Sequence, residues 1–174
     1  MNQHAWAARL RPWLALVRLP NLPTVPGDPL AGLVLAGAVG GRSVGMGAAV
    51  SVSLASLCLY MAGVVLNDLH DLPRDRVQRP ERPLPAGAIS PTAALGLFGG
   101  LAALGLLAAL PAGRQAFFTA VVLLGLIAAY NLVFKDDPAR ACVLMGCCRG
   151  VSMLLGAAAA GAAAAKEKSA FASG

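Results

Sequence analysis

Three long runs without a single charged side chain constrain this chain more than any other feature. Ser43–Asn67 has 25 residues, Pro83–Gly113 has 31 and Gln115–Phe134 has 20. A helix needs about 20 apolar residues to cross the roughly 30 Å hydrocarbon core of a bilayer. Backbone inside lipid must satisfy its own hydrogen bonds, which a helix does within one segment. The runs therefore predict an all-α membrane protein.

Two further spans are expected, and each contains one charged residue: Asp28 near Leu19–Gly41, and Arg149 near Ala141–Ala165. The composition agrees, because only 13% of residues are charged against about 25% in a soluble domain. We therefore predict about five transmembrane helices. The domain prediction is a cytoplasmic amphipathic segment over 1–19, a transmembrane domain over 20–165 and a polar tail over 166–174.

Asp28 lies between Pro26 and Pro29, and the uncharged stretch after it has only 13 residues. Such a stretch cannot span alone, so Leu22–Pro29 is expected to enter the membrane or a protein-lined cavity. Two interpretations of Asp28 are open. It caps the start of a helix whose first position is proline, or it is a buried polar group that faces a site.

The positive charges divide unequally between the two sides that five alternating spans would create. One side receives nine lysines and arginines and the other four, with Arg149 left inside a span. The positive-inside rule places the richer side in the cytoplasm, and we expect an integral protein of the inner or plasma membrane. Because no basic stripe or aromatic stacking platform is present, a nucleic-acid partner is not expected.

An acidic motif follows the first uncharged run, on the predicted cytoplasmic side. On one continuous helix its amide and three carboxylates would project within a 100° arc. Oxygen ligands at this density suit Mg²⁺, and a cation at a membrane surface usually holds a phosphate in turn. The candidate metal ligands are Asn67, Asp68, Asp71 and Asp75.

A loop with two arginines, Arg79 and Arg82, comes next, and prolines at 80, 83 and 85 predict that it is extended. Arginine matches phosphate with paired donors, although the loop could also be only a topology signal. Lys135, five residues after Tyr130, is either another phosphate-binding cation or part of an anchored loop. Carboxylates and arginines this close on one face suit a metal-bridged diphosphate, with an apolar cavity for its hydrocarbon tail.

These residues resemble the UbiA superfamily of intramembrane prenyltransferases. Asn67-Asp68-x-x-Asp71-x-x-x-Asp75 matches the first aspartate-rich motif of that family, N-D-x-x-D-x-x-x-D, without a substitution. Four weaker similarities accompany it, and the resemblance covers roughly Arg18 to Gly156. They are Leu16-Val17-Arg18-Leu19-Pro20-Asn21 at the start of the first helix, Arg79-Pro80-x-Arg82-Pro83-Leu84-Pro85-x-Gly87, Tyr130-x-x-x-x-Lys135, and Cys148-Arg149-Gly150.

The resemblance implies a bundle of nine transmembrane helices around a central cavity, of which this chain would supply the N-terminal part. It implies Mg²⁺-dependent transfer of a prenyl group from a polyprenyl diphosphate to an acceptor, often aromatic, in lipid or quinone biosynthesis. Asn67, Asp68 and Asp71 would bind the metal–diphosphate with help from Asp75, unless Pro73 breaks the helix and moves Asp75 off the shared face. Arg82 and Lys135 would contact phosphate, and Arg79 and Tyr130 would also face the substrate.

The sequence departs from the family in one respect: no acidic residue occurs between Asp137 and Glu167, so the second aspartate-rich motif is absent. We therefore expect a truncated or N-terminal part, with half of the metal site missing and a helix partner needed to supply it. The alternative is a non-catalytic relative that binds a prenyl diphosphate or a partner without turnover. A transporter or channel fragment ranks last, because the acids cluster at a span end.

Overall fold

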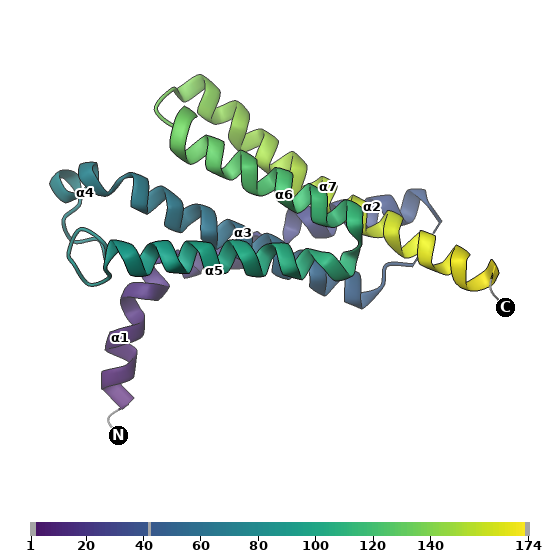
Figure 1. Cartoon of the computed structure of the whole chain (residues 1–174), viewed down its shortest axis with the longest axis horizontal. Coiled ribbons are helices and arrows are strands. Elements are labelled where there is room, and N and C mark those ends of the chain that lie inside the picture. Colours follow the sequence, from purple (N-terminus) through teal and green to yellow (C-terminus); the bar gives the residue numbers. More distant parts are fainter. Residues whose placement is uncertain (1–2, 42, 173–174) are drawn as a thin grey trace.

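The computed structural model describes residues 3–41 and 43–172, with side chains described over 9–41 and 43–161. All secondary structure in these ranges is helical (Figure 1). The α-helices are α1 (Gln3–Leu16), α2 (Gly27–Val39), α3 (Met46–His70), α4 (Leu72–Gln78), α5 (Pro91–Ala109), α6 (Arg114–Ala129) and α7 (Pro138–Ala172). Two 3₁₀ segments, η1 (Leu19–Thr24) and η2 (Leu110–Ala112), and a π-helical turn, η3 (Tyr130–Phe134), complete the set.

Five helical segments are long and apolar enough to cross a membrane, which confirms the predicted number and the all-α class. The segments are Leu19–Val39, Met46–His70, Pro91–Ala112, Arg114–Phe134 and Pro138–Gly161. The chain is therefore described as an integral membrane protein.

The third span begins later than the uncharged run that predicted it. Residues 83–90 form turns, and α5 starts at Pro91 with Ser90 as its cap, whose Oγ accepts from the backbone N–H of Ala93 at 3.2 Å. The prediction that the arginine loop is extended was also wrong. The backbone N–H of Ala86 donates to the carbonyl of Arg82 at 2.9 Å, so the loop folds back on itself.

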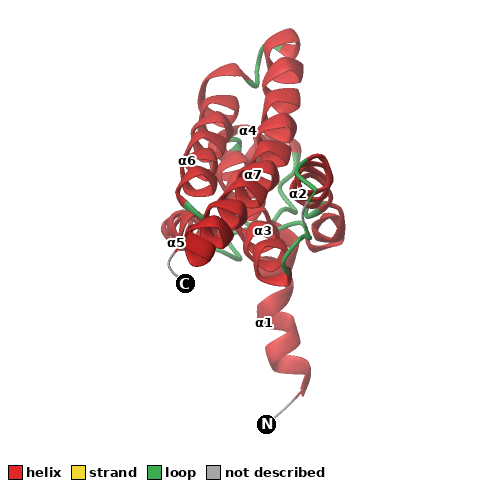
Figure 2. Ribbon diagram, turned by 90° about the vertical axis from the view of Figure 1, so that its right-hand side faces the viewer, coloured by secondary structure: helices red, strands yellow, loops and turns green. Residues whose placement is uncertain are grey.

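The spans run in alternating directions and form two layers. Helices α5, α3 and α2 lie side by side in one layer, and the α6–α7 hairpin covers them (Figure 2). The end of α3, all of α4 and the turn between η3 and α7 lie at one end of the bundle, from which α1 projects (Figure 1). The predicted acidic and basic loops thus share one end.

Helices α2 and α7 cross with their backbones in close contact. A Cβ on Gly156 would lie 1.8 Å from the carbonyl oxygen of Pro29, and one on Gly32 would lie 1.9 Å from that of Met153. Small residues permit this approach where lipid supplies no hydrophobic force between helices. The crossing fixes α2 against α7 beside a core that includes Leu33, Leu59 and Leu155.

Candidate functional site

The acidic motif spans the junction of two helices. Asn67 and Asp68 lie in the last turn of α3, Asp71 is the residue between the helices, and Asp75 lies on α4. The break at Asp71 comes two residues before Pro73, which the first turn of a helix tolerates and a helix interior does not. The prediction of one continuous helix was therefore wrong, and the helix break considered for Pro73 is what occurs. Asp75 nevertheless remains buried, with 5% of its side chain exposed.

Arg82 joins two of the carboxylates. Its NH1 lies 2.7 Å from Asp75 Oδ2 and 3.6 Å from Asp68 Oδ1. The folded-back loop described above brings the arginine onto the helix ends, where one quarter of its side chain stays exposed. Asp68 Oδ1 also accepts from Arg18 NH2 at 3.2 Å. Two arginines from distant segments thus meet at one buried carboxylate.

Lys135 lies between the other two motif residues. Its Nζ is 2.5 Å from Asp71 Oδ1 and donates to Asn67 Oδ1 at 3.0 Å. Asn67 Nδ2 in turn donates to Asp71 Oδ2 at 3.2 Å. Only 9% of the lysine side chain is exposed. Of the two roles considered for Lys135, the arrangement favours a cation held at the site over a loop anchor.

The site is electrically balanced as it stands. Three carboxylates (Asp68, Asp71 and Asp75) face three cations (Arg18, Arg82 and Lys135). Among the described side chains, no three acidic, histidine or cysteine groups converge as a metal-binding set. The chemistry of the donors still fits Mg²⁺, because the oxygens of Asn67 and Asp71 converge on one cation, the ammonium of Lys135, and are of the type that Mg²⁺ prefers.

A cavity of about 460 Å³ opens beside the motif, between α2, α3, α6, η3 and α7. On α3 it is lined by Ser56, Tyr60, Val64 and Asn67, which recur every three or four residues and share one helix face. Apolar side chains form part of the lining, with Leu123 and Ile127 contributed by α6, and polar side chains form the rest. A hydrocarbon chain can therefore lie against the same wall that ends in the motif.

The two remaining predicted site residues, Tyr130 and Arg79, lie in different places. Tyr130 lines the cavity from η3. Arg79 is exposed at the end of α4, and its side chain makes no ion pair with any residue in the described part of the chain. Arg79 thus lies apart from the cluster, because of the two loop arginines only Arg82 reaches the carboxylates of α3 and α4.

Sequence reasoning missed the roles of Arg18 and Asn131 and the pairing of Arg149 with Asp28. Of the two interpretations left open for Asp28, the structure favours the polar group that faces a site. Asp28 does not cap α2, because the helix begins at Gly27 and no side-chain cap bond forms. Asp28 instead binds Arg149, whose NH2 lies 2.9 Å from its Oδ1, and both line the cavity. A lone charge in each of two predicted spans was the available signal for this pair.

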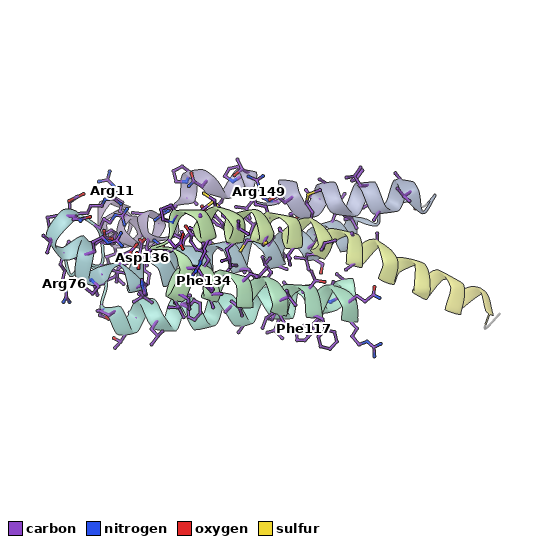
Figure 3. All side chains as sticks on the ribbon, turned by 90° about the horizontal axis from the view of Figure 1, so that it is seen from above. Arg11, Arg76, Phe117, Phe134, Asp136 and Arg149 are labelled. Atoms are coloured by element: carbon purple, nitrogen blue, oxygen red, sulfur yellow. The ribbon has the colours of Figure 1, made fainter. Side chains whose placement is uncertain are left out.

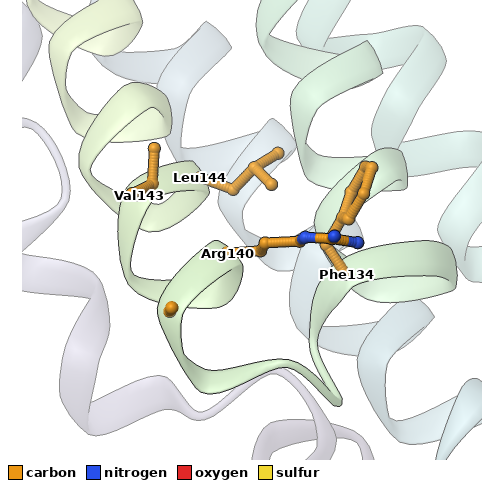
Figure 4. A pocket seen from close by; sticks show the side chains of 5 residues that line it. Phe134, Arg140, Val143 and Leu144 are labelled. Carbon is orange, nitrogen blue, oxygen red and sulfur yellow. The ribbon is translucent and has the colours of Figure 1, made fainter.

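A second, smaller hollow lies outside the motif. It measures about 270 Å³ and is lined by Phe134, Ala139, Arg140, Val143 and Leu144 (Figure 4). The Arg140 guanidinium reaches over the Phe134 ring, 6.0 Å from its centre. Such a contact between a cation and an aromatic face stabilises the turn between η3 and α7, and the hollow holds none of the predicted site residues.

Comparison with known proteins agrees with this geometry. Residues 29–172 match the UbiA prenyltransferase family. The chain is 34% identical over 140 residues to a digeranylgeranylglyceryl phosphate synthase of Natronomonas pharaonis, covering 78% of this chain and 50% of the relative. It is 36% identical over 134 residues to the synthase of that name from Halobacterium salinarum, covering 75% and 46%. The chain thus spans about half the length of these curated relatives.

A solved structure is also similar. It was described in work on the biosynthesis of digeranylgeranylglyceryl phosphate synthase in membranes. The two structures superpose with a TM-score of 0.79 at 25% identity, covering 87% of this chain and 53% of the other. The arrangement of the five spans is therefore shared with a membrane prenyltransferase.

Proposed function

Because this chain belongs to the UbiA prenyltransferase family, we propose that it takes part in transferring a prenyl group from a polyprenyl diphosphate to a hydrophobic acceptor. The observation that carries the proposal is the balanced cluster of three cations and three carboxylates beside a cavity that Asn67 and Arg18 help to line. A bound diphosphate would replace the carboxylates as the ion-pair partner of Arg82 and Lys135. The released carboxylates, with Asn67, would be left to hold a cation.

In the proposed reaction the bond from C1 of the prenyl chain to the diphosphate oxygen breaks, and the diphosphate leaves with both electrons. A nucleophilic atom of the acceptor forms the new bond to C1 and loses its proton to water. Mg²⁺, held by Asn67, Asp68, Asp71 and Asp75, would neutralise charge on the leaving diphosphate. Arg82 and Lys135 would bind the outer phosphate oxygens, with Arg79 at the rim and Tyr130 against the first part of the chain.

The acceptor is proposed from the relatives. Their name describes a glyceryl phosphate that carries two geranylgeranyl chains, so a geranylgeranyl diphosphate donor and a glyceryl phosphate ether acceptor are the first pair to examine. The family resemblance also admits an aromatic acceptor.

The site is proposed to face the cytoplasm. Nine lysines and arginines belong to the segments at the motif end and four to those at the other end. Residues 1–19 would then lie on the cytoplasmic surface, 20–165 would form the transmembrane domain and 166–174 a polar tail. A helix partner that supplies further ligands remains part of the proposal.

The test measures binding of geranylgeranyl diphosphate to the purified chain in detergent, with Mg²⁺ or with a chelator. Asp68→Ala and Asp71→Ala should weaken Mg²⁺-dependent binding at least tenfold. Asp136→Ala is the matched control, because Asp136 is an exposed carboxylate that pairs with Arg74 outside the cluster (Figure 3). Binding like that of the wild type in both cluster variants would refute the assignment.

A second candidate is a relative that binds prenyl diphosphate without turnover. It is favoured by the charge balance, because the three carboxylates are already neutralised within the described part of the chain. An assay with donor, acceptor and Mg²⁺ separates the two. Release of diphosphate by the chain alone would exclude the second candidate, and tight binding without release would favour it.

A further inference from the structure

An ion pair lies in the middle of the membrane-spanning region, away from the acidic motif. Arg149 is 11 residues after the start of the span Pro138–Gly161 and 12 before its end. Asp28 is 9 residues after the start of Leu19–Val39 and 11 before its end. Figure 3 shows Arg149 far from Arg76 and Asp136 at the motif end. Charges at this depth are expensive and usually mark a functional site.

The arginine of this pair is more exposed than the aspartate. The Arg149 side chain is 74% exposed and that of Asp28 only 26%. Asp28 lies one helical turn from Gly32, at the α2–α7 crossing, so its carboxylate is fixed against α7. Among the described residues, Asp28 is the one hydrogen-bond partner of the guanidinium, which has five N–H donors. Asp28 therefore holds a cation that lines the cavity and most of whose side chain is exposed.

Asn131 adds an unsatisfied acceptor to the same cavity. Its side chain is buried, and its Nδ2 donates to the carbonyl of Ile127 at 2.8 Å. Only the amide nitrogen can donate to a carbonyl, so this bond fixes which way the amide points. Its Oδ1 is buried and has no hydrogen-bond partner among the side chains and backbone that the structure describes. A buried acceptor without a donor is costly, and the π-helical turn that carries it is a feature frequent at functional sites.

The cavity places Arg149 below the motif but Asn131 near its level, because Ile127 adjoins Gly63, and these two residues lie one helical turn before Asn131 and Asn67. Asn67 stands at the mouth, and the hydrogen-bonded pair Ser56–Ser152, at 3.2 Å, lies at the far end. Helices α3 and α7 run in opposite directions (Figure 1), so Arg149 lies near the level of Tyr60. Seven residues at 1.5 Å each put that level roughly 10 Å deeper than Asn67.

We propose that Arg149, positioned by Asp28, and Asn131 form a subsite for the polar head of the acceptor. The ligand would be an amphiphile with one anionic group, bound by the Arg149 guanidinium, and one hydroxyl or N–H donor, bound by Asn131 Oδ1. The charged residues of the cavity wall are Arg18, which pairs with Asp68, and the Arg149–Asp28 pair. The arginine is the more exposed member of the second pair, which favours a negatively charged ligand. The inference rests on the proposed function, because it assigns the second substrate of that reaction.

The first test uses the unmodified chain in detergent and a series of synthetic ligands. A monoalkyl glyceryl phosphate with a free hydroxyl should bind at least tenfold more tightly than the neutral monoalkylglycerol. It should also bind more tightly than its O-methyl ether. A hydroxybenzoate in a parallel arm tells whether the anion and hydroxyl are recognised on a glyceryl ether or on an aromatic ring. Equal affinities across both series would overturn the proposal without any variant.

The second test compares variants. Arg149→Gln should remove the preference for the phosphate over the neutral ligand, and Asn131→Ala the preference for the hydroxyl over the ether. The affinity of both variants for geranylgeranyl diphosphate should stay within twofold of that of the wild type. Loss of diphosphate binding in the wild type would instead overturn the proposed function.

A charge swap separates recognition from helix packing. Asp28→Arg combined with Arg149→Asp keeps an ion pair between α2 and α7 but turns a carboxylate outward. Binding of the phosphate ligand should be lost while the helical content by circular dichroism is kept. If the swapped protein binds the phosphate ligand as the wild type does, the pair only joins the helices and the inference is wrong. If the swapped protein does not fold, the ligand series on the unmodified chain decides.

Discussion

The crossing of α2 and α7 yields a sharp prediction, for the substitution Gly156→Ala. The added Cβ would lie 1.8 Å from the carbonyl oxygen of Pro29 and 2.7 Å from the backbone nitrogen of Leu33. Ordinary contacts of this kind begin near 3.4 Å. The atoms it meets are backbone, which cannot rotate away as a side chain can. The two helices must therefore separate locally by about 1.6 Å, the shortfall between those distances.

The expected magnitude combines two opposed terms. Alanine is favoured over glycine in a helix by about 1 kcal/mol, while overpacking a tight contact costs about 1–3 kcal/mol. Because a backbone clash lies at the upper end of that range, we expect Gly156→Ala to lower the free energy of unfolding by about 1–2 kcal/mol. The same separation would weaken the Asp28–Arg149 pair, which lies on the same two helices.

Gly150→Ala is the matched control, since Gly150 is on the same helix and no atom of the described residues lies within 4 Å of its added Cβ. This control should keep or raise stability, so the two substitutions should have opposite signs. Thermal unfolding followed by circular dichroism in one detergent measures both. A midpoint for Gly156→Ala at or above that of Gly150→Ala would refute the close crossing.

Further predictions concern the diphosphate cluster and the α3–α5 contact. Arg82→Gln should weaken geranylgeranyl diphosphate binding at least tenfold, or about 1.4 kcal/mol, because Arg82 bridges two carboxylates of the acidic motif. Arg76 lies on the exposed side of α4, so Arg76→Gln should bind geranylgeranyl diphosphate with an affinity within twofold of the wild type. If a radioligand assay shows the same loss of affinity for Arg76→Gln as for Arg82→Gln, the assignment of Arg82 is contradicted. Ser51→Ala should lower stability by about 1 kcal/mol, because Ser51 Oγ donates to the carbonyl of Ala108. Ser53→Ala on the same helix is its control, and equal unfolding midpoints would argue against that bond.

The sequence by itself determined the spans, the segments at each end and the family. Crossing lipid depends on the length and polarity of one continuous stretch, so Gln115–Phe134 could be recognised without knowledge of its neighbours. The motif from Asn67 to Asp75 is equally local. The start of α5 was misplaced because uncharged turn residues at 83–90 look like span residues when only charge is considered.

Only the tertiary structure decided which groups meet. Lys135 reaches Asn67 across 68 positions and Arg149 reaches Asp28 across 121. The oxygen of Asn131 that lacks a partner in the described part of the chain is likewise defined by what surrounds it after packing. The physical reason is that a charge in a nonpolar surrounding is tolerated only beside its partner. That partner is set by how helices cross, at contacts such as Gly32 and Gly156, and not by the order of residues along any one span.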